Sequence, residues 1–156
     1  PASLYKFQTL KSLDLSRNKL SSIPNEISYC PALVELNISE NNLTNLPNLS
    51  PIKTLEHLII NDNKIKGLPL LGEGLRKVEA SSNSVSEIRA STFQNCSKLE
   101  ILTLNKNGVE RIEKGAFSQA RSMVVLELKE NRLACFTEAP WSEKLDILAL
   151  SFNRLT

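Results

Sequence analysis

The stretch "LKSLDLSRN" (residues 10–18) places leucines at positions 10, 13 and 15 and ends in Asn18. The same frame recurs six times, as "LVELNISEN", "LEHLIINDN", "LRKVEASSN", "LEILTLNKN", "MVVLELKEN" and "LDILALSFN". The steps between the seven closing asparagines are 23, 22, 20, 24, 24 and 22 residues. Self-similarity at such a period indicates a repeat protein, and the seven copies fill the chain.

Within each copy, apolar and polar residues alternate, which predicts a short strand with one face buried. The remaining residues must return the chain to the start of the next strand, so the strands run parallel. A single unit cannot bury its own apolar face, whereas stacked units share one continuous core. The repeat therefore predicts a solenoid in which each unit contacts mainly its neighbours.

The chain resembles the leucine-rich repeat family, whose repeats are about 20–29 residues long, and the resemblance covers nearly all of residues 10–156. It implies an α/β solenoid: a right-handed coil with a concave parallel β-sheet and short helical or irregular convex segments. Two copies, at residues 91–99 and 115–123, resemble the Phe-bearing 24-residue class. The fourth copy is the weakest, because Val78 and Ala80 replace two leucines, and any bend or opening is expected there.

The seven asparagines fall where each predicted strand ends and the chain turns away from the sheet. Such a turn leaves backbone N–H and C=O groups facing the interior, and an amide side chain can both accept from and donate to them. We interpret these residues as a buried structural ladder and not as ligand-binding groups. The ladder comprises Asn18, Asn41, Asn63, Asn83, Asn107, Asn131 and Asn153.

The composition is that of an ordinary globular domain, with 41% hydrophobic and 23% charged residues in a chain of 156. We expect one leucine-rich repeat domain of about seven repeats over residues 1–156. Because the chain ends directly after the seventh predicted strand, we expect it to be part of a longer protein. No apolar run approaches the roughly 18 residues that a membrane-spanning helix needs.

Two signals bear on the cellular compartment, and they disagree. Cys30 and Cys96 occupy equivalent positions three repeats apart, about 14 Å at a strand spacing of about 4.8 Å, which is too far for a disulfide. Cysteines that stay reduced favour a cytoplasmic protein. The alternative, an extracellular protein, is favoured by four N-x-S/T sequons, which begin at Asn37, Asn42, Asn48 and Asn95.

No set of residues in the sequence has the spacing of a catalytic, metal-binding or cofactor-binding site. His57 is the only histidine, and it has no partner at a catalytic or metal-binding spacing. The "GEG" at residues 72–74 lacks the third glycine of a dinucleotide fingerprint and is interpreted as a tight turn. We therefore predict no catalytic residue, no metal and no cofactor.

The predicted concave face is acidic. We take its outward positions as those six, four, two and one residues before each asparagine. They hold seven acidic and four basic residues, so this face carries a net charge of −3, whereas the rest of the chain carries +5. Because a negative surface repels phosphates, we predict no nucleic-acid partner.

Since neither an enzyme nor a nucleic-acid-binding protein is indicated, we predict a non-catalytic protein–protein interaction module. It would act as a scaffold that binds a protein partner on its concave face. The family resemblance implies the same, and a rigid curved sheet provides an extended binding surface. Two alternatives are a ligand-binding ectodomain of a cell-surface receptor and a substrate-targeting segment of a larger signalling enzyme. The oligomeric state stays open.

One column of outward positions, six residues before each asparagine, is polar in the first four copies and aliphatic in the last three, at Ile101, Val125 and Ile147. This pattern predicts an apolar strip on the C-terminal half of the concave face. Beside it lies an acidic N-terminal half formed by Asp14, Glu35, Asp62 and Glu79. In the alternative interpretation, the edge of the coil half-shields this column, which then tolerates aliphatic residues. The candidate binding residues are Asp14, Glu35, His57, Ile59, Glu79, Ile101, Thr103, Val125, Glu127, Ile147, Ala149 and Phe152.

Overall fold

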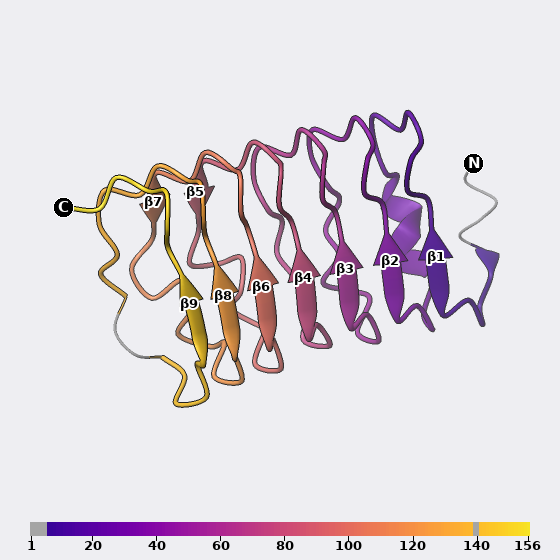
Figure 1. Ribbon diagram of the computed structural model, residues 1–156. Helices are drawn as coiled ribbons and strands as arrows, with labels where there is room; N and C mark the ends of the chain where they lie inside the picture. Colours follow the sequence, from indigo (N-terminus) through magenta and orange to yellow (C-terminus); the bar gives the residue numbers. More distant parts are fainter. Residues whose placement is uncertain (1–5, 139–140) are drawn as a thin grey trace.

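The computed structural model describes residues 6–138 and 141–156. Seven short strands, one from each repeat, lie side by side in a parallel sheet (Figure 1). In sheet order they are β1 (Ser12–Asp14), β2 (Glu35–Asn37), β3 (His57–Ile59), β4 (Lys77–Glu79), β6 (Ile101–Thr103), β8 (Val125–Glu127) and β9 (Ile147–Ala149). The sheet order follows the chain order, which confirms the predicted solenoid.

The strands show the predicted alternation, with the middle residue directed inward and its two neighbours outward. Middle residues of adjacent strands pair directly with one another, as Leu36 does with Leu58 and Leu102 with Leu126. These four side chains are fully buried. The stacked leucines therefore form one column in which every repeat covers the next.

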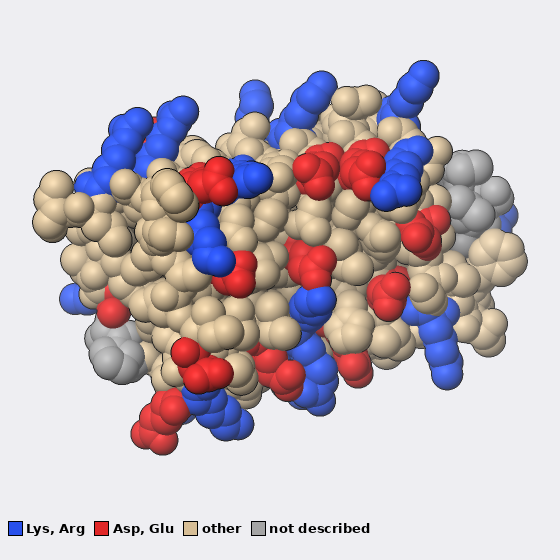
Figure 2. Space-filling view, in the orientation of Figure 1, with Lys and Arg blue, Asp and Glu red and all other residues tan. Residues whose placement is uncertain are grey.

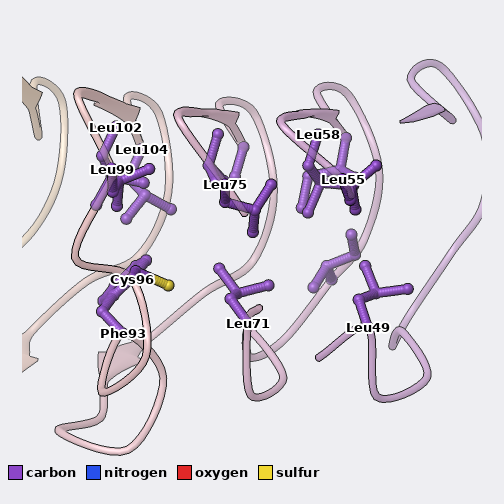
Figure 3. Close-up of a cluster of buried hydrophobic side chains, with 14 of the residues drawn as sticks. Leu49, Leu55, Leu58, Leu71, Leu75, Phe93, Cys96, Leu99, Leu102 and Leu104 are labelled. Carbon is purple, nitrogen blue, oxygen red and sulfur yellow. The ribbon is translucent and has the colours of Figure 1, made fainter. Parts of the chain in front are cut away.

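A second set of apolar side chains closes the core from the side opposite the sheet. In Figure 3, Leu58 and Leu102 come from the strand side, whereas Leu49, Leu71 and Phe93 come from the segments that return the chain to the next strand. All five are buried. The core is thus a narrow layer between the sheet and these returning segments.

Near the C-terminal end, aromatic rings extend this second set from repeat to repeat. The ring centroids of Phe93 and Phe117 are 5.8 Å apart, and those of Phe117 and Trp141 are 5.1 Å apart. Phe136 lies against Trp141 at 6.1 Å. Aromatic pairs at such separations stabilise the fold beyond the area that they bury, so Phe117 links three successive repeats.

The returning segments are mostly irregular. A 3-10 helix, η2 (Asn25–Tyr29), follows Pro24. A two-stranded parallel sheet of β5 (Glu87–Ile88) and β7 (Arg111–Ile112) was not predicted. This sheet joins the segments that follow Asn83 and Asn107. Each of these asparagines is 24 residues before the next one, and the equal lengths let the two backbones follow the same path.

Cys30 and Cys96 are both fully buried in the core, whereas Cys135 is exposed. Burial raises the pKa of the Cys30 thiol, and it raises that of Cys96 to about 12. The Cys96 thiol also donates to the carbonyl oxygen of Gly72 at 3.6 Å. Since the thiolate is the reactive form, Cys30 and Cys96 behave as core residues with little reactivity at neutral pH.

The sheet does not open at the fourth repeat, the place where any opening is expected. Strand β4 pairs in register with both β3 and β6, and Val78 and Ala80 are fully buried. This repeat follows the shortest step in the chain, and its returning segment lies unusually close to the previous one. A Cβ added to Gly74 would stand 2.8 Å from the carbonyl oxygen of Leu55, and closer still to that of Lys53.

Replacing Gly74 with alanine should therefore lower the free energy of unfolding by about 1–3 kcal/mol, because rigid backbone atoms occupy the space that the methyl group needs. Gly67→Ala is the matched control, since a Cβ there meets nothing within 4 Å; its effect should stay within about 0.5 kcal/mol. Urea denaturation of both variants measures the difference. Equal stabilities would contradict the close approach at Gly74.

Candidate protein-binding surface

The outward side chains of the seven strands form one surface, here called the strand face, which consists of the first and third residues of each strand. Most are half-buried, because neighbouring strands flank them on both sides. Eleven of the twelve candidate binding residues lie on it: Asp14, Glu35, His57, Ile59, Glu79, Ile101, Thr103, Val125, Glu127, Ile147 and Ala149. The twelfth, Phe152, follows the end of β9.

The asparagines run along the edge where the strands end, and Asn63 shows their pattern. Its Oδ1 accepts a hydrogen bond from the backbone N–H of Leu43 at 3.0 Å. Its Nδ2 donates to the carbonyl oxygens of Ile38 at 3.0 Å and of Ile60 at 3.3 Å. Equivalent bonds to the preceding repeat are made by Asn41, Asn83, Asn107, Asn131 and Asn153.

Asn18 differs because no described repeat precedes it. Its Nδ2 donates only to carbonyl oxygens of its own repeat, those of Leu15 and Ser16, both at 3.0 Å, and the residue is exposed. The prediction that Asn18 is a buried amide is therefore wrong. Burial at this position comes from the repeat in front: Asn41, Asn63 and Asn131 are buried, whereas Asn83, Asn107 and Asn153 are half-buried.

The residue before each asparagine adopts the left-handed conformation, with φ between 53° and 57°. Residues other than glycine rarely adopt it, and for a bulky side chain it is an outlier. No sequence signal marks the position, whose seven residues are Arg17, Glu40, Asp62, Ser82, Lys106, Glu130 and Phe152. Phe152 is 80% exposed, so this aromatic side chain contributes little to the core.

Apart from Ile59, the N-terminal half of the strand face is polar, and several of its charged residues have local partners. Lys77 forms an ion pair with Glu79, whose carboxylate also accepts a hydrogen bond from Nδ2 of Asn61 at 3.3 Å. Nδ1 of His57 lies 3.8 Å from Oε2 of Glu35. The ammonium group of Lys77 offsets the charge of Glu79 and so weakens the field that this half projects.

Asp14 also has a local role. Its carboxylate accepts a hydrogen bond from the backbone N–H of Ser16 at 2.8 Å, and hydrogen bonding with Ser16 lowers the pKa of Asp14. The next charges along this edge, Arg17 and Glu40, pair at 2.9 Å.

The net charge of the outward positions is unevenly divided. In the first four repeats, five acidic residues (Asp14, Glu35, Glu40, Asp62 and Glu79) exceed two basic ones (Arg17 and Lys77). The last three repeats hold two of each: Glu127, Glu130, Lys106 and Lys129. This count covers the strand face together with the two residues before each ladder asparagine. Over these positions the whole net charge of −3 lies in the first four repeats, and the last three repeats are neutral.

Ile101, Val125 and Ile147 form what we call the apolar strip. Val125 pairs in register with Ile101 on one side and with Ile147 on the other, so the three side chains are direct neighbours. Ile101 and Val125 are half-buried and Ile147 is 45% exposed. Figure 2 shows this part of the strand face, over β6, β8 and β9, as a mostly uncharged area.

The other candidate residues divide between the two halves. Ala149 pairs with Glu127 beside the apolar strip, and Glu127 accepts a hydrogen bond from Nδ2 of Asn105 at 2.6 Å. Thr103, on β6, pairs with Glu127, on β8. Ile59 is separated from the strip by β4 and is not part of it.

The C-terminal end of the sheet is partly uncovered. Leu148 is 42% exposed and Leu155 is 43% exposed, although both occupy positions that are buried in earlier repeats, and Leu150 is partly buried. A leucine in these positions needs a following repeat to cover it.

Among the described residues, no group of three or more His, Cys, Asp or Glu side chains is arranged to hold a metal ion. Over the same residues, no helix has the length and apolar character required to cross a bilayer.

A family model described as leucine rich repeat matches residues 1–43 and 73–133. The chain is 31% identical over 156 residues to the Oplophorus-luciferin 2-monooxygenase non-catalytic subunit of Oplophorus gracilirostris, covering 95% of this chain and 43% of that protein. It is 32% identical over 129 residues to leucine-rich repeat-containing G-protein coupled receptor 5 of Rattus norvegicus, covering 82% and 12%. The chain thus spans less than half the length of either relative.

Solved structures share the fold. The leucine-rich repeat ectodomain of a plant membrane receptor kinase of Arabidopsis thaliana, in complex with Casparian strip integrity factor 2, superposes with a TM-score of 0.80 at 27% identity. The match covers 98% of this chain and 19% of that one. A complex of TLR13 with single-stranded RNA matches with a TM-score of 0.68 at 26% identity, covering 94% and 25%. The fold therefore does not itself exclude nucleic acid, and our exclusion stays a prediction from charge.

The comparisons also bear on the compartment. The relatives are mostly receptors and extracellular repeat proteins, so they support the extracellular alternative and give no support to the cytoplasmic prediction. The matched repeats, the relatives' sequences and the coil of seven parallel strands agree on one assignment. The chain belongs to the leucine-rich repeat family.

Proposed function

We propose that this chain is a non-catalytic, protein-binding module of an extracellular leucine-rich repeat protein, and that its partner docks on the strand face. The observation that carries the proposal is the apolar strip of Ile101, Val125 and Ile147. These three side chains are neighbours on adjacent strands, in a column that is polar in the first four repeats.

The strip has the character of an interface centre. Ala149 and the exposed ring of Phe152 extend the apolar surface near β9. Clustered apolar anchors supply most of the affinity at protein interfaces, whereas charges at the rim mainly steer association. The first four repeats carry the whole net charge of −3 of the strand face and the two residues before each ladder asparagine. A fitting partner therefore has an apolar anchor for the strip and a basic flank facing β1 to β4.

The comparisons favour a receptor ectodomain over a substrate-targeting segment of a signalling enzyme. One relative is a receptor, another is named as a non-catalytic subunit, and a related ectodomain was solved with a bound factor. Each name describes that protein only. The same strand face would be available to the partner in either setting.

Val125→Asp should weaken partner binding by at least about 2 kcal/mol, roughly 30-fold in Kd, because it places a charge in the middle of the apolar strip. Folding should be nearly unaffected, since the same column accepts Glu35 on β2. Ser12→Asp on β1 is the matched control, because it adds the same charge to the same column far from the strip.

The measurement compares extracellular proteins captured by the immobilised chain and by both variants, followed by affinity measurement on the protein that depends on Val125. Charge reversal at Glu35 should slow association in a salt-dependent way. If Val125→Asp unfolds the chain, or captures every partner as well as Ser12→Asp does, the apolar strip is not the binding site.

A further inference from the structure

We infer that Asn42, Asn48 and Asn95 carry N-linked glycans, and that these glycans leave the strand face over β6, β8 and β9 uncovered. The inference rests on the extracellular setting of the proposed function. It specifies a modification of this chain and the direction from which a partner can approach.

At the first and third of these sequons, both the asparagine and its hydroxyl residue are exposed: Asn42 with Thr44, and Asn95 with Ser97. At the second, Asn48 is exposed and Ser50 is half-buried. The Oδ1 of Asn48 accepts a hydrogen bond from the backbone N–H of Ser50 at 3.0 Å. This turn engages the amide oxygen and leaves Nδ2, the atom that is modified, directed away from that contact.

The fourth sequon, at Asn37, has a different environment. Asn37 is the third residue of β2, on the strand face, and its Oδ1 accepts a hydrogen bond from the backbone N–H of Ser39 at 3.1 Å. Ser39 is only 8% exposed and its Oγ is buried. The folded chain therefore hides the hydroxyl that the sequon requires, and a glycan here would stand on the strand face between Asp14 and Ile59.

The three exposed sequons lie away from the strand face. Asn42 directly follows the ladder residue Asn41, at the edge beyond the strand ends, where its backbone N–H donates to the carbonyl oxygen of Leu20 at 2.9 Å. Asn48 and Asn95 each precede a buried residue, Leu49 and Cys96. Figure 3 places Leu49 and Cys96 on the side of the core opposite the strands. Glycans at Asn48 and Asn95 would therefore project from the back of the coil.

Residues 98–156 contain no N-x-S/T sequence, and they include all of β6, β8 and β9. No glycan acceptor therefore follows Asn95 in the three repeats that carry the apolar strip. A glycan is bulky and hydrated, so it blocks docking where it is attached. Glycans confined to the edge and back of the coil would leave the strand face, including its part over β6, β8 and β9, as the side from which a partner can approach.

The modification is the transfer of an oligosaccharide from a lipid diphosphate donor of the secretory pathway. The bond between the sugar C1 and the phosphate oxygen breaks, and a bond between C1 and Nδ2 of the asparagine forms. Nδ2 loses one proton, and the lipid diphosphate is the leaving group. The step involves no oxidation or reduction.

The test is glycopeptide mass spectrometry of the full-length protein secreted from eukaryotic cells, with peptide-N-glycosidase digestion in 18O water to mark each occupied asparagine. Sugar is expected at Asn42, Asn48 and Asn95 and not at Asn37. Thr44→Ala, Ser50→Ala and Ser97→Ala should each remove one glycan without altering an asparagine. Asn45→Gln, at an exposed asparagine outside any sequon, should remove none.

Sugar at fewer than two of the three sites, or any sugar at Asn37, overturns the inference. The readout needs no partner, so it is independent of the capture experiment with Val125→Asp. Occupied sites together with unchanged capture by that variant would reject the proposed binding surface alone. Bare sites together with lost capture would reject the glycans alone.

Discussion

Replacing Phe117 with alanine should lower the free energy of unfolding by about 3–5 kcal/mol, the range for removing a fully buried aromatic side chain. The ring is 0% exposed and lies between Phe93 and Trp141, with centroid distances of 5.8 and 5.1 Å. Its loss leaves a cavity and breaks the aromatic column that joins three repeats. Urea denaturation, followed by circular dichroism, measures the change.

Phe152→Ala is the matched control, because it makes the same substitution at a ring that is 80% exposed. Its effect on stability should stay within about 0.5 kcal/mol, as for surface substitutions generally. A loss at Phe117 no larger than that at Phe152 would contradict the role of the aromatic column. If Phe152→Ala also weakens capture of a partner, it supports the proposed extension of the apolar strip.

The fold could be predicted because its determinants recur in sequence. The alternation around Leu13, Leu36 and Leu58 sets one strand in each repeat, and the fixed offset of the asparagine sets where the strand ends. Seven copies in the same register leave little freedom for another arrangement. The outward positions of the strand face followed from that register.

Features that depend on one repeat meeting another could not be predicted. The pairing of β5 with β7 depends on two returning segments running side by side. The close approach at Gly74 depends on where the backbone of Lys53 and Leu55 passes. The exposure of Asn18 depends on the absence of a described repeat in front of it, because its pattern of apolar positions is the same as in the buried copies.

The local charge pairs of the strand face could not be predicted from the sequence either. The sequence predicts an acidic N-terminal half, and the sign of its net charge holds. Charge counts do not reveal that Lys77 pairs with Glu79 or that His57 lies beside Glu35. Those contacts depend on side-chain positions, and the Lys77–Glu79 pair weakens the field with which the acidic half steers a partner.

Asn63→Asp should lower the free energy of unfolding by about 3–5 kcal/mol at neutral pH, because it buries a charge without a partner. The Nδ2 atom that it replaces donates to carbonyl oxygens of Ile38, Ile60 and Asn61 at 3.0–3.3 Å. A carboxylate oxygen cannot donate to them. The neutral substitution Asn63→Ala leaves the same groups unpaired without adding charge, and should cost about 1–3 kcal/mol.

The same two substitutions at Asn18 are the matched controls, since the sequence position in the repeat is identical but the residue is exposed. Asn18 bonds only within its own repeat, so Asn18→Ala should cost less than about 1 kcal/mol. Water can solvate the carboxylate of Asn18→Asp, which should therefore behave like Asn18→Ala. Urea denaturation of the four variants separates the contribution of the neighbouring repeat from that of the local turn. If Asn63→Asp is no more destabilising than Asn18→Asp, the ladder between repeats contributes nothing to stability.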